Sequence, residues 1–151
     1  MHMSARSEKS TRKGPRGLRV PQELEALVQR EADMRGRSWS AMIVELLEEA
    51  MRMRRVPGIA FANGAVGRRA VVAGTGLDVW EVVSAWKELG EDEDRLQQAY
   101  PWLSPMQLSS ALTYYRLYPR EINARLEREW LWSEQAVREE LPYAAPRAPN
   151  T

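Results

Sequence analysis

The residues best suited to a chemical task in this chain are the arginines and lysines near its amino terminus. Residues 1–21 carry six basic side chains against the single acid Glu8, the remaining residues are acidic overall, and the formal net charge is +1. Clustered cationic groups attract a polyanion because binding releases its condensed counterions. A basic arm ahead of an acidic body therefore favours a nucleic-acid partner, and the other interpretation of the arm is a solubilising tail.

Catalysis has few candidate residues in this sequence. The chain has no cysteine and one histidine, His2, which lies in the terminal tail. Disulfides, thiolate metal sites and thiol nucleophiles are therefore excluded. The acid run at residues 91–94 lacks the alternating ligands and the glycine of a calcium loop, so it is typical of a solvated helix start. We therefore expect that the protein is not an enzyme and that it binds neither a cofactor nor a metal.

The composition is that of a folded protein, with a hydrophobic fraction of 44% and six tryptophans. No apolar run approaches the roughly 18 residues that span a bilayer. Residues 1–13 lack the apolar stretch of a signal peptide. The absence of cysteine fits a reducing compartment. We expect a cytoplasmic protein with no membrane segment.

The elements that must position the basic residues are one short strand and two helices. Over residues 16–21 apolar and other side chains alternate, which is the period-two pattern of a strand. Apolar residues at helical spacing follow over residues 22–35, and Gly36 is placed to end that helix. Ser38 can cap a second helix that continues to Arg55.

A unit of about 40 residues without disulfides cannot bury enough apolar surface alone, so dimerisation must complete its core. A lone strand also has unpaired backbone groups on both edges, and the same strand of a second chain can satisfy one of them. The pattern therefore predicts a homodimer, or a higher even oligomer, held by a two-stranded antiparallel ribbon.

Two motifs in this segment, Gly17-Leu18-Arg19-Val20-Pro21 and Gly36-Arg37-Ser38-Trp39-Ser40, resemble the ribbon-helix-helix family of Arc, MetJ and CopG repressors. The resemblance implies that the ribbon enters the major groove of double-stranded DNA. By the same resemblance, the outward strand positions are Pro15, Gly17 and Arg19.

Arg19 is the strongest base reader among those three positions. Its guanidinium can bond guanine O6 and N7, whereas Pro15 and Gly17 offer no side-chain donor. Specificity then rests on Arg19, on the neighbouring Arg16 and Lys13, or on DNA shape. The alternative for Arg19 is a solvated strand residue.

The resemblance also implies a phosphate contact at the start of the second helix, where free backbone N–H groups and the helix dipole favour an anion. The residues placed there are Arg37, Ser38, Trp39 and Ser40. For Trp39 a position in the core or the dimer interface is an equal alternative.

A second segment begins after the turn cluster at residues 56–58. Strand candidates at residues 59–61 and 69–73 flank a turn and predict a hairpin. Capping boxes at Asp78 with Glu81 and at Ser104 with Gln107, and a cap at Asp92, predict three helices.

Residues 58–118 resemble domain of unknown function 433, an antitoxin-like family of VapB type with a helix-turn-helix. The matching motifs are Gly74-Thr75, Val79-Trp80 and Tyr100-Pro101-Trp102-Leu103-Ser104. Gly76 stands where the family usually has a basic or polar residue. Gln107 and Thr113 are candidate DNA contacts on the last of the three helices, but residues 76–100 are strongly acidic, which opposes phosphates and leaves packing, dimerisation or partner binding as the alternative.

The tail, residues 119–151, predicts a helix over residues 120–141 followed by a proline-rich disordered end. Trp130, Leu131 and Trp132 are adjacent and cannot all face one core, so Leu126, Trp130 and Trp132 are candidate partner-binding residues.

The sequence thus predicts a mainly α fold with a short β ribbon: a ribbon-helix-helix dimer, a small β-hairpin and three-helix domain of helix-turn-helix type, and a C-terminal helix. The expected segments are a disordered basic arm (1–14), the DNA-binding and dimerisation domain (15–55), the antitoxin-like domain (58–118) and the C-terminal helix and tail (119–151). The two resemblances imply an autorepressing type II antitoxin that neutralises a PIN-like nuclease toxin through its C-terminal half. The alternative is a stand-alone dimeric repressor.

Overall fold

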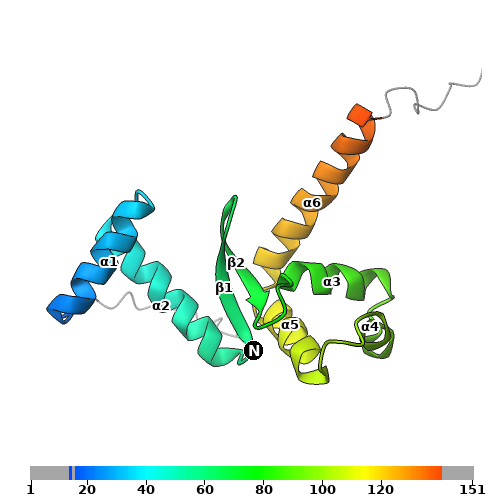
Figure 1. Cartoon of the computed structure of the whole chain (residues 1–151), viewed down its shortest axis with the longest axis horizontal. Coiled ribbons are helices and arrows are strands. Elements are labelled where there is room, and N and C mark those ends of the chain that lie inside the picture. The colour runs from blue at the N-terminus through cyan, green and yellow to red at the C-terminus, as the bar shows by residue number, and fades with distance from the viewer. Residues whose placement is uncertain (1–13, 15, 141–151) are drawn as a thin grey trace, which may run out of the picture. The chain divides into compact units, whose positions relative to one another are not determined.

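The computed structural model describes residue 14 and residues 16–140 (Figure 1). The chain divides into two compact units, Met1–Glu45 and Leu46–Thr151. The division falls inside helix α2, Trp39–Arg55. Over the described residues the fold is mainly helical with one two-stranded antiparallel sheet, as the sequence predicted. No helix within this part of the chain has both the length and the apolar character needed to cross a membrane.

The first unit contains helix α1, Gln22–Met34, and the first turns of α2. Gly36 follows α1 with φ +61°, the left-handed conformation expected at that helix end. The Ser38 hydroxyl accepts a hydrogen bond from the backbone N–H of Ala41 at 3.1 Å, which confirms the predicted cap of α2. Both helices therefore begin and end close to the residues that the periodicity indicated.

Residues 16–21 adopt no regular secondary structure, so the expected strand is not formed in the single chain. A strand needs a neighbour for its N–H and C=O groups, and the neighbour expected here belongs to a second chain. Leu18, which the ribbon would place on its apolar face, is exposed. The dimer and its ribbon remain predictions.

The second unit opens with a hairpin of β1, Ile59–Gly64, and β2, Gly67–Val72. Ile59 pairs with Val72 and Gly64 with Gly67, so the turn is formed by residues 65–66. Both strands run closer to the turn than the periodicity indicated. Gly58, with φ +96°, precedes β1, and a Cβ there would lie only 2.8 Å from Ser110 Oγ.

Four helices follow the hairpin, and local caps fix where they begin. They are α3, Val79–Glu88; α4, Glu93–Ala99; α5, Pro105–Leu117; and α6, Pro119–Glu140. The capping boxes at the starts of α3 and α5 are present. Asp92 accepts from the N–H groups of Asp94 and Arg95, so the acid run begins α4.

The core of the second unit lies where the hairpin, α3 and α5 meet the base of α6, and the far part of α6 extends away from α3 and α5 (Figure 1). Tyr114 from α5 is its largest fully buried side chain. Its remaining buried members are apolar side chains from the hairpin, from all four helices and from the connections at Val56 and Leu103. The hairpin and the base of α6, distant in the sequence, are thus held in one packed unit.

Candidate DNA-binding and partner-binding surfaces

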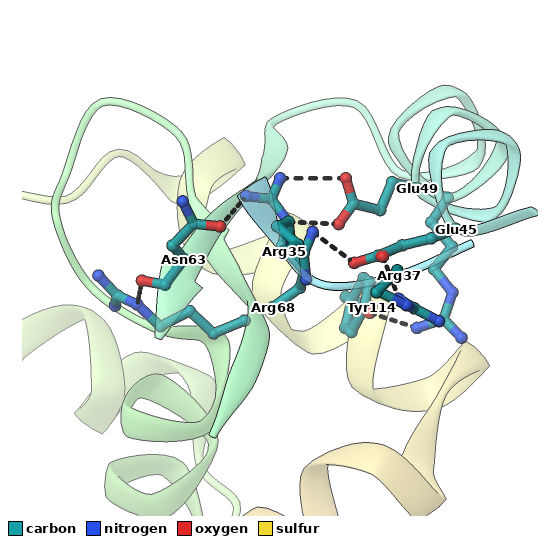
Figure 2. Close-up of polar contacts among 9 residues, drawn as sticks. Arg35, Arg37, Glu45, Glu49, Asn63, Arg68 and Tyr114 are labelled. Atoms are coloured by element: carbon teal, nitrogen blue, oxygen red, sulfur yellow. Dashed lines mark hydrogen bonds and ion pairs between the residues drawn. The ribbon is translucent and has the colours of Figure 1, made fainter. Parts of the chain in front are cut away.

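The start of α2 carries the residues predicted to contact phosphate. Glu45 lies between Arg35 and Arg37 and pairs with both guanidinium groups (Figure 2). Arg37 is consequently held near the helix start, but its charge is partly compensated. Ser38 uses its hydroxyl as the helix cap, and Ser40 is exposed. An anion at this helix end would therefore meet mainly the free first-turn N–H groups.

Trp39 is half-buried and packs against the small core formed by Val28, Ala32 and Met42. Its indole Nε1 is buried with no partner in the described part of the chain. This position matches the core interpretation of Trp39. A contact from its side chain to DNA would require the ring to leave that core.

The other predicted DNA contacts of the first unit lie in its extended amino-terminal segment. Arg16, Gly17 and Arg19 are exposed. Lys13 and Pro15 lie outside the described residues. These three positions are therefore accessible, and their contact with DNA remains a prediction.

An unpartnered apolar surface is the most distinctive feature of the first unit. Only three of its described hydrophobic side chains are buried. Five large ones are exposed: Leu18, Leu24, Leu27, Met34 and Val44. We call these five residues the apolar face. Because isolated units this small rarely leave so much apolar area in water, the apolar face indicates an interface.

The candidate DNA contacts of the second unit are largely occupied. Gln107 Oε1 accepts the backbone N–H of Ser104 at 2.9 Å, which is its half of the capping box. Thr113 is half-buried. Ser110 donates to the carbonyl of Pro57 at 2.8 Å. Helix α5 therefore serves the core more than a groove, as its buried side chains also indicate.

The predicted partner-binding residues of α6 divide into two kinds. Leu126 packs against the core of the second unit. Trp130 and Trp132 are 61% and 73% exposed. The spacing of the apolar residues along α6 did not distinguish Leu126 from the two tryptophans. Contact with the core depends on helices that are distant in the sequence. The exposed surface left for a partner is the far part of α6.

A cavity of about 520 Å³ lies between the hairpin turn and α6, and no feature of the sequence predicted it. Its lining combines the turn with Asp78 and Trp80 at the start of α3 and with Arg125, Arg128 and Trp132 of α6. No local motif predicts this cavity, because its walls come from segments about 50 residues apart in the chain. We call it the hairpin cavity.

The hairpin cavity has a structured wall at the beginning of α3. Asp78 is buried, pairs with Arg69 of β2, and accepts the indole N–H of Trp80 at 2.9 Å. Its backbone N–H donates to Glu81 at 2.8 Å. Arg125 lies over the Trp80 ring at 5.3 Å and pairs with Glu129. The Asp78 carboxylate thus joins β2 of the hairpin to the start of α3.

Replacing Asp78 with alanine is expected to destabilise the second unit by about 2 kcal/mol, because the change removes the ion pair that this buried carboxylate forms with Arg69 and leaves the Trp80 donor without its acceptor. Chemical denaturation followed by tryptophan fluorescence measures the difference. Asp94→Ala is the matched control, since that residue is exposed on α4. Equal stability of the two variants would contradict the role of Asp78.

A second polar cluster surrounds Tyr114 of α5. Arg52 of α2 donates to the Tyr114 hydroxyl at 2.9 Å and pairs with Glu121 of α6. Tyr114 in turn donates to Glu121 at 2.8 Å. Burial, together with the bond to Glu121, raises the pKa of Tyr114 well above its ordinary value. The hydroxyl therefore remains protonated, which suits a structural tie between three helices better than acid–base chemistry.

Arg68 of β2 forms a bidentate ion pair with Glu49 of α2 and donates a hydrogen bond to Asn63 of β1 across the hairpin (Figure 2). Its two bonds to Glu49 measure 2.6 and 3.0 Å. These contacts attach the hairpin to the second half of α2. They also fix the orientation of one basic wall of the hairpin cavity.

A hairpin followed by three capped helices defines the central module of the second unit. Residues 59–115 match the family DUF433, described as a protein of unknown function. The match runs from the start of β1 into α5 and confirms the predicted resemblance to domain of unknown function 433, whereas the antitoxin assignment remains a prediction. No curated protein and no solved structure matches the chain. The ribbon-helix-helix resemblance of residues 15–55 therefore remains a prediction.

Proposed function

We propose that this protein is a homodimeric DNA-binding repressor and the antitoxin of a type II toxin–antitoxin pair. The observation that carries the DNA-binding part is the apolar face of the first unit. A second copy would cover these side chains and pair residues 16–21 of the two chains as a ribbon. The exposed Arg19 would then lie on the side of the ribbon that enters the major groove.

The charge distribution supports the same proposal. The six basic residues at positions 1–21 attract phosphates, whereas the body that follows is acidic overall. In the second unit, Leu46–Thr151, the Gln107 side chain accepts the Ser104 N–H and the Ser110 hydroxyl donates to the Pro57 carbonyl, so these polar groups of α5 are already engaged. DNA binding is therefore proposed for the first unit alone, in a cytoplasmic protein.

The antitoxin part rests on the order of the segments and on the exposed end of α6. Trp130, Leu131 and Trp132 are exposed on three sides of one helix, an arrangement suited to a partner that surrounds it. We propose that a PIN-like nuclease toxin is that partner. The family match itself assigns no activity.

Arg19→Ala is expected to weaken binding to the chain's own operator by about 1–3 kcal/mol, because a bidentate contact to guanine is lost. Fluorescence anisotropy with the DNA upstream of the gene measures the change. Arg30→Ala, on the exposed surface of α1, is the matched control. Unchanged operator affinity of Arg19→Ala would refute the groove contact.

The toxin is tested by co-expressing the chain with the product of the adjacent reading frame. A stable complex that rescues growth supports the antitoxin. Trp130→Ala combined with Trp132→Ala should weaken that complex while leaving operator binding unchanged. If the chain binds its operator but no neighbouring gene encodes a nuclease-like protein, the antitoxin proposal is overturned. The protein would then be a stand-alone repressor.

A further inference from the structure

We propose that the hairpin cavity binds a nucleotide, with the base against Trp80 or Trp132 and the phosphate at Arg128. The site belongs wholly to the second unit, so it is independent of DNA binding by the ribbon. Three properties of the lining carry the proposal: its available charge, its aromatic rings and its size.

The available charge of the hairpin cavity is positive. Its three carboxylates each have a cationic partner: Asp78 has Arg69, Glu129 has Arg125, and Glu121 has Arg52. Arg128 also lines the cavity, and within the described residues no ion pair or hydrogen bond engages it. An anion therefore meets one uncommitted guanidinium beside carboxylates whose charge is already compensated.

A neighbouring donor adds to this capacity. The Nε–H of Arg125 is buried and lacks an acceptor in the described part of the chain. Buried donors usually have a partner, and a phosphate oxygen is an acceptor that a guanidinium accommodates well. A small shift of this side chain toward the cavity would supply that partner.

Two indole rings give the hairpin cavity its aromatic part. Trp80 is anchored by its bond to Asp78, whereas Trp132 also lines the cavity and is largely exposed. Nucleobases stack on such rings regardless of sequence, because every base has a π face. A hydrophobic peptide would fit less well, since most of the remaining side chains of the lining are charged.

The size of the hairpin cavity matches a mononucleotide. Its volume of about 520 Å³ lies within the roughly 300–1,000 Å³ of small-molecule sites. A DNA duplex cannot enter a space of this volume. A single nucleotide can come from solution or from a single-stranded nucleic acid, and the two sources share the same chemistry.

Isothermal titration calorimetry on the full chain tests the proposal with adenosine 5′-monophosphate, adenosine, inorganic phosphate and a single-stranded deoxyadenylate hexamer. We expect the monophosphate to bind at least tenfold more tightly than adenosine or phosphate alone. Arg128→Gln and Trp132→Ala should each weaken that binding about tenfold. Tight binding of the hexamer alone, with the same sensitivity, would support the site and identify a strand as the source.

Matched controls separate this site from the basic arm and from a loss of folding. Arg120→Gln and Trp130→Ala alter exposed residues of α6 that do not line the cavity, and they should leave nucleotide affinity unchanged. Thermal denaturation checks that every variant is folded. Absence of binding by all four probes, or binding that is insensitive to Arg128→Gln and Trp132→Ala in folded variants, overturns the proposal.

Discussion

Replacing Tyr114 with alanine is expected to lower the free energy of unfolding of the second unit by about 3–5 kcal/mol, as removal of a large buried aromatic ring does in other cores. The side chain is fully buried. Its ring lies 6.3 Å from Phe61 of β1 and 4.8 Å from Tyr118, centroid to centroid. The change therefore opens a cavity between the hairpin and α5. Urea denaturation followed by tryptophan fluorescence measures the loss.

Tyr114→Phe separates the ring from the hydroxyl. This variant keeps the packing but loses the hydrogen bonds of the hydroxyl to Arg52 and to Glu121, so we expect a smaller loss of about 1–2 kcal/mol. If the two variants lose equal stability, the ring contributes no packing energy and the argument for Tyr114→Ala is wrong.

The pH dependence of stability provides a second readout of the same hydroxyl. Because the pKa of Tyr114 is raised on folding, the unfolded chain loses this proton at a lower pH than the folded chain does. Stability is therefore retained below about pH 10, the ordinary tyrosine value, and declines as the pH rises above it. Tyr114→Phe should show a shallower alkaline decline than the unaltered chain.

The helices of this chain could be predicted from sequence because their signals are local. Asp92 caps α4, and Ser104 with Gln107 begins α5, as residue types at fixed spacing indicated. Each motif brings together groups two or three residues apart, so it is visible in the local sequence. The hairpin was predictable for the same reason, although its strands reach further into the turn.

The cluster around Tyr114 and the hairpin cavity could not be predicted. Arg52 and Glu121 are 69 residues apart, and their charges have no visible relation in the sequence. Which aromatic residue of α6 faces the hairpin depends equally on tertiary packing. The sequence placed Leu126 with Trp130 and Trp132 as one partner-binding group, but Leu126 is partly buried and packs against the core.

The strand at residues 16–21 illustrates a different limit. Its alternation is visible in the sequence, yet the single chain does not form it. Hydrogen bonds of a strand require a second strand, and no other described segment of the first unit provides one. The two-chain ribbon therefore remains a prediction from the alternation of residues 16–21.

Leu27→Glu is accordingly expected to dissociate the proposed dimer and to reduce operator affinity by at least about 100-fold. Leu27 is 58% exposed on α1, so the substitution should not disturb the fold of one chain. In a symmetric dimer the position occurs twice. Each buried leucine contributes about 1.5–3 kcal/mol, and about 1.4 kcal/mol corresponds to a factor of ten in the dissociation constant.

Sedimentation velocity measures the association of Leu27→Glu, and fluorescence anisotropy measures its operator affinity. The matched control is Met106→Glu, which introduces the same charge at an exposed apolar residue of α5 in the second unit. We expect this control to remain dimeric and to bind DNA normally. A dimeric Leu27→Glu with unaltered affinity would show that the apolar face has another occupant, and the ribbon would lose its principal support. Loss of operator affinity in a variant that stays dimeric would instead place Leu27 near DNA, and this would contradict its proposed position in the dimer interface.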